Sequence, residues 1–529
     1  MNLALLQVGI KKKQFSKKKE GNKMKYSISF KQHIEKDETY IDSFILTSID
    51  NKIKIEDTNL DKIFELKGSN NITVSSLEFW GPFLITYLFK NGYKSDEDSK
   101  VLTKKYTFNT LINSSNDWYR ITVKSKNGKI QFENFEKKIG TTVEAFMENM
   151  NIAGIENDGI NYAIKMLDEQ KLDCLTIGSA CVKDFKRMGY CHSAYSKIDD
   201  KQEEFIRESY HGGLCGKGNK DTYEGKITVI DMNSMYPFVM CKYSLPFGSG
   251  RYVEGKCKSK LFIQRFIATL RLKKDKIPCL VQKNMFMGVE PIYFDRCELT
   301  LTSVDIDNMY KNYEVHNIIF IDGYEYDEVK SQYNSYIEKW YSNKLNSKKE
   351  NNISLYYLSK LMLNNLSGKL AAKRKFEKKN ITMDKNGELK DNYTIIDSED
   401  WYLPAACFIT AYARKELIET AETIGNEILY YDTDSLHVAG DINNLERIDN
   451  FKLGYWKVEG IYEKGIYIKE KVYAEKLIDG EWEYTVAGCP YEAKQQLTED
   501  NFKEGTVLKI TNTKKIKGGC IKKESTFTI

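Results

Sequence analysis

The sequence predicts a multidomain protein that combines α/β and α+β domains, and three observations lead to this fold class. Its 529 residues are enough for about two to four domains with separate cores. A composition of 41% apolar and 29% charged residues is typical of a globular protein. Short strand-like runs and longer helical runs follow one another along the chain, without an internal repeat. Because no run of roughly 18 apolar residues occurs, we expect no membrane span.

The eleven cysteines are odd in number and form no C-x-x-C pair, which is typical of reduced thiols and predicts a cytoplasmic protein. The net charge of +5 is small, but two stretches, Lys11–Lys25 and Lys509–Lys523, are strongly basic. Such stretches either bind phosphates or form solvated ends of a lysine-rich chain. The 12% of aromatic residues suits base stacking and an ordinary core equally well.

Taken in order, the chain divides into five parts. Residues 1–23 form a basic leader that we expect to be disordered, and residues 24–175 alternate strands and helices as an α/β domain. Residues 176–225 are a linker, residues 226–479 form the largest domain, and residues 480–529 form a lysine-rich C-terminal domain. Two segments of the largest domain stand out: mixed β structure at 241–330, and a polar stretch at 371–404 in which Asp384–Glu388 predicts the turn of a hairpin.

A strand near residue 230 ends in an aspartate. Ile227, Val229 and Asp231 alternate on one face, so Asp231 lies where an apolar strand gives way to a turn. An acid in this position is either the N-cap of the next helix, which begins near Tyr236, or a metal ligand.

Two more carboxylates lie at the tip of a second apolar segment. Residues 426–438 predict a hairpin whose turn contains Asp432, Thr433 and Asp434. Taken alone, this turn reads as an ordinary solvated loop. Between buried strands it would suit a divalent cation, because hard cations prefer clustered carboxylate oxygens.

A long helical region, about 327–373, predicts two helices joined near residues 348–352. Its second half has a buried stripe at Leu355, Leu358, Met362 and Leu366. Lys360, Asn364 and Ser367 fall on the opposite face, which either cradles a polyphosphate or simply faces solvent.

Together, Asp231, Asp432 and Asp434 can hold two metal ions for in-line phosphoryl displacement, with Lys360 taking phosphate charge. The spacing alone does not distinguish a nucleotidyl transferase from a metal-dependent nuclease.

Several motifs resemble those of family B DNA polymerases, in the same order and at similar spacing. They are VIDMNSMYP, KLMLNNLSGK, YYDTDS, the K-x-Y motif at Lys471–Tyr473, the YHGG segment at Tyr210–Gly213 and ITAYAR at Ile409–Arg414. The chain from about residue 24 to its end, including GGCIKKESTFTI, is similar in particular to the protein-primed polymerases of small bacteriophages. The resemblance implies a right-hand polymerase with palm, fingers and thumb, preceded by a ribonuclease H-like domain of the 3′–5′ exonuclease type.

Carried over by position, the resemblance implies three groups of site residues. The catalytic metal ligands would be Asp231, Asp434, the Met232 carbonyl and Asp432, for two Mg²⁺ ions that Mn²⁺ can replace. The dNTP contacts would be Tyr236, which excludes a 2′-hydroxyl, with Lys344, Lys360 and Asn364. The DNA contacts would be Tyr210, Gly212, Gly213, Thr410, Arg414, Lys471 and Tyr473.

The resemblance also implies partners. A monomeric enzyme would bind primer–template DNA, dNTPs and a terminal priming protein, without a membrane. The insertion at 241–330 would contact the priming protein, and the insertion at 371–404 would encircle the template and support strand displacement.

Two departures from the family pattern matter. Ser29, Lys31, Ser76 and Trp80 stand where the exonuclease motifs have their acids and asparagine, and only Asp158 remains, with Gly154 in place of the tyrosine before it. Since one carboxylate cannot hold two metal ions, we predict that this domain has lost its exonuclease activity.

The second departure concerns the polymerase helix, where Asn365 and Ser367 replace the serine and tyrosine of the pattern. Looser base selection is therefore expected. A few extra residues between Lys344 and Lys360 leave the role of Lys344 open. Two other hypotheses remain: a polymerase-fold protein that only binds DNA or a terminal protein, and an active polymerase with an untemplated or defence-related task.

Overall fold

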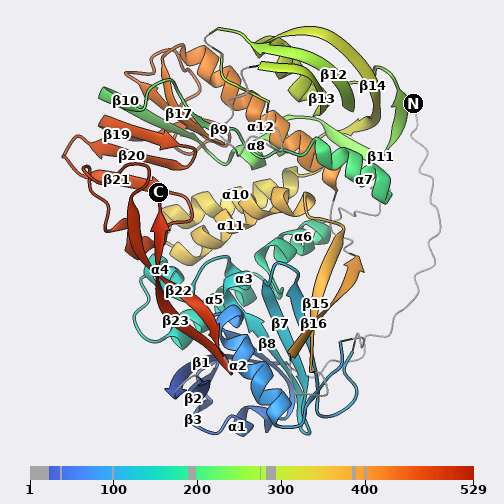
Figure 1. Ribbon diagram of the computed structural model, residues 1–529, viewed down its shortest axis with the longest axis vertical. Helices are drawn as coiled ribbons and strands as arrows, with labels where there is room; N and C mark the ends of the chain where they lie inside the picture. The colour runs from blue at the N-terminus through green and yellow to red at the C-terminus, as the bar shows by residue number, and fades with distance from the viewer. Residues whose placement is uncertain are drawn as a thin grey trace.

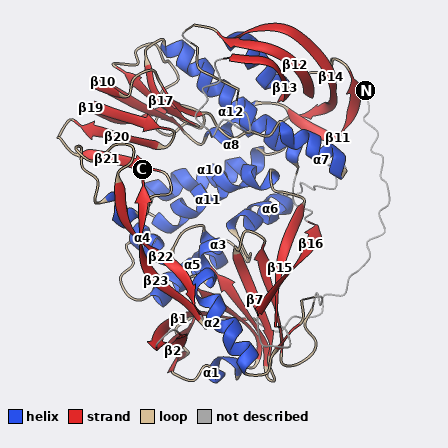
Figure 2. Ribbon diagram, in the orientation of Figure 1, coloured by secondary structure: helices blue, strands red, loops and turns tan. Residues whose placement is uncertain are grey.

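The computed structural model describes residues 23–35, 38–97, 101–188, 198–274, 276–280, 293–383, 389–397, 402–516 and 518–529 (Figure 1). Residues 1–22 of the expected leader and the hairpin turn at 384–388 lie outside the described residues. The described strands form four sheets, and a layer of helices crosses the middle of the molecule between its two β-rich ends (Figure 2).

The N-terminal domain is built on a mixed sheet with helices packed against it. Apolar side chains such as Ile28, Ile72 and Phe132 are fully buried in its core. β1 pairs in parallel with β4, and β4 with β8, while β2 and β7 run antiparallel to their neighbours. The elements are β1 (Met24–Glu35), β2 (Glu38–Ser48), β3 (Lys54–Asp57), α1 (Asp61–Phe64), β4 (Gly68–Val74), α2 (Leu77–Lys90), β5 (Lys94–Ser95), β6 (Thr107–Asn113), β7 (Trp118–Lys124), β8 (Gly128–Asn134), α3 (Phe135–Ile139), α4 (Val143–Met150) and α5 (Glu156–Glu169).

A second sheet brings together strands from distant parts of the chain. Its order is β21-β20-β19-β10-β18-β17-β9, so that β10 lies between β18 and β19 at its centre. β21, which we expected in the C-terminal domain, continues this sheet. The strands are β9 (Cys215–Lys217), β10 (Thr222–Met232), β17 (Ile428–Asp432), β18 (Ser435–Ala439), β19 (Trp456–Lys469), β20 (Val472–Leu477) and β21 (Trp482–Val486). Helices α6 (Ile177–Arg187), α7 (Asp200–Glu208), α8 (Met235–Lys242) and α12 (Leu403–Ile424) complete this half of the chain.

The first insertion forms its own four-stranded antiparallel sheet, as the mixed β pattern predicted. Its order is β11-β14-β12-β13. The elements are β11 (Leu245–Glu254), β12 (Leu261–Leu272), β13 (Tyr293–Thr302), α9 (Ser303–Asn312) and β14 (Tyr313–Val329).

Two packed helices, α10 (Asn334–Lys349) and α11 (Ile353–Leu370), confirm the predicted break near residue 350. Leu358, Met362 and Leu366 are buried as expected. The prediction for Ser367 was wrong: this residue is buried and does not share the exposed face of Lys360 and Asn364. One helical turn beyond Asn364, the backbone has rotated Ser367 toward the core, and its hydroxyl donates to the Asn364 carbonyl at 3.4 Å.

The second insertion forms the predicted hairpin, β15 (Lys375–Met383) with β16 (Leu389–Asp397). The hairpin does not stand alone, because β15 also pairs with β6 and so extends the N-terminal sheet (Figure 1). No local sequence pattern predicted this pairing, because it joins strands far apart in the chain.

The C-terminal part comprises α13 (Tyr491–Lys494) and a long hairpin, β22 (Val507–Ile516) with β23 (Gly519–Thr528). Cys520 at the start of β23 is fully buried in the core of the N-terminal domain. Gly519 lies so close to Phe83 of α2 that a β-carbon there would overlap the ring. Within the described residues, every helix is too short or too polar to cross a membrane.

Candidate catalytic site

Two strand ends meet at the centre of the second sheet and bring the predicted carboxylates together. Asp231, at the end of β10, is registered against Ser435 at the start of β18. The N–H of Met232 donates to the Asp434 carbonyl at 2.8 Å, which ties the turn after β17 to the end of β10. The hairpin with Asp432, Thr433 and Asp434 at its tip is therefore confirmed. Thr433 adopts a left-handed backbone conformation (φ 56°), as tight turns require.

The alternative role of Asp231 as a helix N-cap does not hold. α8 begins at Met235, and its N-cap position is Ser234, which makes no side-chain capping bond. The Asp231 carboxylate instead lies 3.2 Å from Lys457 on β19.

The three carboxylates differ in how their charge is compensated. Burial, and next the charge of Asp231, raise the pKa of Asp434 to about 7. Burial also raises the pKa of Asp231, although Lys457 opposes the shift. Asp432 is paired with Lys471 at 2.7 Å. Among the described residues, Asp434 has no lysine or arginine partner, so its ionised form is left without a compensating cation.

Buried oxygen ligands that lack compensating charge are the chemistry that a divalent cation satisfies. In the described part of the chain, however, no three acidic, histidine or cysteine side chains converge as a finished ligand group. Lys457 and Lys471 hold the Asp231 and Asp432 carboxylates instead. The oxygen atoms of these carboxylates therefore suit metal ions. To bind a metal, Asp231 and Asp432 would have to give up their ion pairs with Lys457 and Lys471.

The predicted nucleotide-binding residues lie next to these strand ends. Lys344 of α10 donates to the Ser234 hydroxyl at 3.2 Å, directly after β10. Burial, followed by the charges of Lys457 and Lys360, lowers the pKa of Lys344 to about 8. Lys344 lies on α10 and Lys360 on α11, on either side of the connection between the two helices.

The remaining nucleotide-binding predictions are placed as follows. Lys360 and Asn364 are exposed on α11. Tyr236, in the first turn of α8, is half-buried, and its burial raises its pKa to about 12. Its hydroxyl therefore stays protonated at neutral pH.

The Tyr210–Gly213 segment packs against the catalytic turn rather than standing apart from it. The Thr433 N–H donates to the Leu214 carbonyl at 2.6 Å. A β-carbon at Gly213 would overlap the Thr433 side chain, whereas the space around Gly212 is open. Only glycine at residue 213 permits this close approach.

Direct DNA contacts by Arg414 and Thr410 are not supported. Arg414 is 2% exposed and uses its five N–H donors within the protein, on the Asp305 carboxylate and on the carbonyls of His211 and Gly212. Thr410 is buried, and its hydroxyl donates to the Ala406 and Cys407 carbonyls. Both side chains are therefore structural, and Arg414 holds the Tyr210–Gly213 segment in place.

Lys471 and Tyr473 lie at the turn from β19 to β20, beside the same carboxylates. Lys471 adopts a left-handed conformation (φ 59°), and its N–H donates to the Tyr430 hydroxyl at 2.7 Å. The Tyr473 ring lies 4.5 Å from the Tyr430 ring. Tyr430, two residues before Asp432, thus supports both members of the K-x-Y motif.

Sequence reasoning missed Lys457 and Asp305. Lys457 faces Asp231 only because β19 pairs with β10, about 230 residues away in the chain. Asp305 belongs to α9 of the first insertion. Lys457 is one lysine among many, and Asp305 occupies a helix-capping position. Nothing in their local sequence therefore indicates that they pair with Asp231 and Arg414.

The structure shows other contacts for several of the residues expected at a degenerate exonuclease site. Phe30, between Ser29 and Lys31, packs against Trp80 with ring centroids 5.2 Å apart, so Ser29 and Lys31 point to the other face of β1. Asp158 accepts a hydrogen bond from the Ile155 N–H at 3.0 Å and caps α5.

Ser76 is the N-cap residue of α2, and its hydroxyl donates to the Glu136 carboxylate at 3.3 Å. Asp158, the one carboxylate among the five residues, therefore caps the N-terminus of α5.

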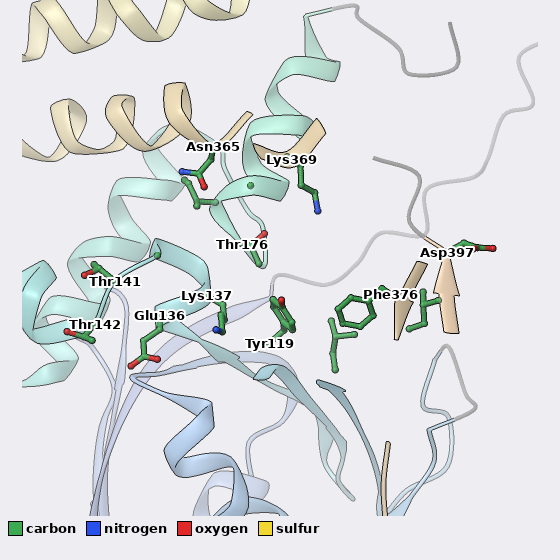
Figure 3. Close-up of a pocket in the computed structure, with 15 residues that line it drawn as sticks. Tyr119, Glu136, Lys137, Thr141, Thr142, Thr176, Asn365, Lys369, Phe376 and Asp397 are labelled. Atoms are coloured by element: carbon green, nitrogen blue, oxygen red, sulfur yellow. The ribbon is translucent and has the colours of Figure 1, made fainter. Parts of the chain in front are cut away.

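A cavity of about 870 Å³ lies beside α11, between the N-terminal domain and the β15–β16 hairpin (Figure 3). Asn365 and Lys369 of α11 face it from one side, and Tyr119 and Phe376 lie together on another, 6.1 Å apart. Its rim also carries Glu136, Lys137, Thr141, Thr142 and Thr176.

Comparison with known proteins places the chain in a family. Residues 17–452 match the family model described as DNA polymerase type B, organellar and viral. The DNA polymerase of Bacillus phage Nf is 27% identical, over 86% of this chain and 90% of its own length. The DNA polymerase of Streptococcus phage Cp-1 is 26% identical, over 92% of this chain and 93% of its own.

The fold agrees with this placement. The structure of phi29 DNA polymerase in complex with primer–template DNA and incoming nucleotide superposes with a TM-score of 0.85, at 25% identity, over 96% of this chain and 100% of that one. The right-hand polymerase fold with an exonuclease-type domain is thus confirmed. The chain belongs to the organellar and viral type B DNA polymerases, and it is a DNA polymerase of the phi29 type.

Proposed function

We propose that this chain is a DNA-directed DNA polymerase that extends a protein primer by two-metal nucleotidyl transfer and does not proofread. The observation that carries the proposal is the hydrogen bond from Met232 to the Asp434 carbonyl, which holds the ends of β10 and β17 side by side. This arrangement, together with the charge of Asp231 acting on Asp434, supports a divalent cation shared by the two carboxylates.

Asp231 and Asp434 would hold two Mg²⁺ ions, helped by Asp432 and the Met232 carbonyl; Mn²⁺ would fit the same oxygen ligands. When bound, such ions lower the pKa of an attacking hydroxyl and neutralise charge on the phosphates. Lys457 and Lys471 neutralise Asp231 and Asp432 until then. With metal on these carboxylates, the ammonium groups of Lys457 and Lys471 would be free to contact primer phosphates.

The helices opposite the carboxylates bind the incoming nucleotide. Burial, followed by the charges of Lys457 and Lys360, lowers the pKa of Lys344, and a triphosphate bound beside these lysines would relieve their repulsion. Asn364 follows Lys360 by one helical turn on the same exposed face. Tyr236, held by burial, forms the wall under the sugar.

The template strand passes through the cavity beside α11. Its rings, Tyr119 and Phe376, suit base stacking, and Lys137 and Lys369 suit a phosphate backbone. α11 then carries the nucleotide-binding residues on one face and the cavity residues Asn365 and Lys369 on the adjacent face. Templated synthesis requires the template and the incoming nucleotide to lie side by side in this way.

The priming protein would dock on the four-stranded sheet of the first insertion, whose α9 is tied to the catalytic half through the Asp305–Arg414 pair at 2.8 Å. We further propose that the enzyme acts as a monomer in the cytoplasm of a phage-infected host.

Loss of proofreading rests on the N-terminal domain. Lys31 puts positive charge on the face where a metal ligand is expected, and Asp158 is committed to capping α5. The domain keeps its sheet and its core, so its fold survives without the ligands for two ions.

Incorporation of labelled dNTPs on a primed template tests the polymerase assignment of the site. We expect Asp434→Asn to lower the rate by about a thousandfold, or about 4 kcal/mol of transition-state stabilisation. Asp441→Asn is the matched control, because Asp441 is an exposed aspartate just past β18 that pairs with Lys226. Equal rates for the two variants would show that Asp434 does not take part in catalysis.

A further inference from the structure

The β15–β16 hairpin of the polymerase half is joined to the sheet of the N-terminal domain by a short strand pairing. Lys378 and Lys379 of β15 are registered against Asn113 and Ile112 of β6. One residue beyond this register, the Ser114 N–H donates to the Glu377 carbonyl at 3.0 Å. The hairpin thereby becomes the edge of a ten-stranded sheet (Figure 1).

A buried ion pair lies at this junction. The Lys378 ammonium is 2.7 Å from a Glu97 carboxylate oxygen, and the two side chains are 8% and 6% exposed. Glu97 also accepts hydrogen bonds from the N–H and the hydroxyl of Thr110 on β6. Burial raises the pKa of Glu97 despite the nearby lysine, so desolvation offsets part of the attraction. Such a pair favours one geometry strongly but contributes little net stability.

The junction closes a ring around the cavity beside α11. One part of the ring is continuous chain, from β6 through β7, β8 and α3 to α6. α6 packs on α11 in a large apolar core, and α11 runs directly into β15. Among the described residues, two non-covalent links close this ring: the α6–α11 core, and the short pairing of β15 with β6, beside which the Tyr119 and Phe376 rings lie 6.1 Å apart. The second is the weaker, because it consists of a few strand hydrogen bonds and one ion pair.

We propose that the Glu97–Lys378 junction is a gate that determines which template topology the polymerase copies. A template with a free end threads through the closed ring, whereas a covalently closed circle enters only when β15 detaches from β6. This inference rests on the proposed passage of the template through the cavity.

A reversible cross-link tests the gate. Ser114 and Glu377 are both exposed, and facing residues of an antiparallel pair have Cα atoms about 5.5 Å apart, within the range that a disulfide spans. Ser114→Cys/Glu377→Cys would be oxidised, then supplied with one template sequence in two forms, linear and circular, each with the same annealed primer. Ser114→Cys and Glu377→Cys alone, treated identically, control for the native cysteines.

We expect the oxidised double variant to extend the linear template at the wild-type rate and to start at least about tenfold more slowly on the circle, with full recovery after reduction. An equal rate on both templates would overturn the gate. An equal loss on both templates would also overturn it, because the cross-link would then impair synthesis rather than entry. Wild-type extension on the linear template checks the proposed function separately, since its failure would appear without any cross-link.

Glu97→Gln provides a second measurement that needs no oxidant. It keeps an acceptor for Thr110 and removes the charge that Lys378 faces. We expect several-fold faster initiation on circles with unchanged initiation on linear templates. Unchanged initiation on both templates would show that the ion pair does not control the gate.

Discussion

Gly213 lies against Thr433 so closely that the catalytic turn and the segment preceding β9 form one packed unit. Adding a methyl group to Gly213 must displace Thr433, which lies between Asp432 and Asp434. We expect Gly213→Ala to lower the polymerisation rate at least about tenfold, because small displacements of catalytic groups are costly, and to leave the thermal midpoint nearly unchanged.

Gly212→Ala is the matched control, since its β-carbon would meet open space. Gly213→Ala combined with Thr433→Gly relieves the overlap, because it also removes the β-carbon of residue 433, and should restore part of the rate. If the single variants at 212 and 213 had equal activity, the close approach would have no catalytic importance.

The Asp305–Arg414 pair predicts a large effect on stability. Replacing Arg414 by methionine leaves a buried carboxylate and the carbonyls of the 211–212 backbone without their donor. We expect a loss of about 3–5 kcal/mol in the free energy of unfolding, measured by urea denaturation. Lys311→Met, which breaks the surface pair with Glu419 at 2.8 Å, should cost less than about 1 kcal/mol. Similar losses for both variants would contradict the structural role of Arg414.

Glu136 predicts a pH-dependent stability. Burial, and next the charge of Glu78, raise its pKa from 4.5 to about 7. Between these values the native state binds more protons than the unfolded state, so stability falls as pH rises. Glu136→Gln removes this cost.

We therefore expect Glu136→Gln to match the wild type near pH 4.5 and to exceed it above pH 7, by about 1 kcal/mol after allowance for the partial exposure of the side chain. Thermal unfolding of both proteins at acidic and alkaline pH measures the difference. Glu148→Gln, at an exposed position of α4, controls for the lost charge. A gain that is the same at both pH values would refute the assignment.

Asp158 predicts a purely structural phenotype. Asp158→Ala removes the acceptor for the Ile155 N–H at the start of α5 and should cost about 1 kcal/mol of stability. Primer extension should be unchanged within error. A fall in any 3′-end degrading activity of the variant would show that Asp158 still serves catalysis.

Much of this architecture follows from local sequence pattern. The carboxylates of the β17–β18 turn, the strand ending at Asp231 and the α10–α11 pair were all predictable, because alternation, turn residues and helical spacing are short-range signals. The contacts of Asp231 with Lys457, of Arg414 with Asp305 and of β15 with β6 were not, since each joins segments far apart in the chain. Ser367 shows that prediction from helical spacing can fail even within one helix. The spacing assigned this polar residue to the exposed face of α11, but it is buried.

The most direct test of a polymerase without proofreading uses a 5′-labelled primer on a longer template, with Mg²⁺ and with or without dNTPs. With dNTPs, we predict extension to the template end by the wild type and none by Asp434→Asn. Without dNTPs, we predict that the primer keeps its full length through long incubation. Metal-dependent shortening of the primer by the wild type, reduced in Asp158→Ala, would contradict the loss of the exonuclease.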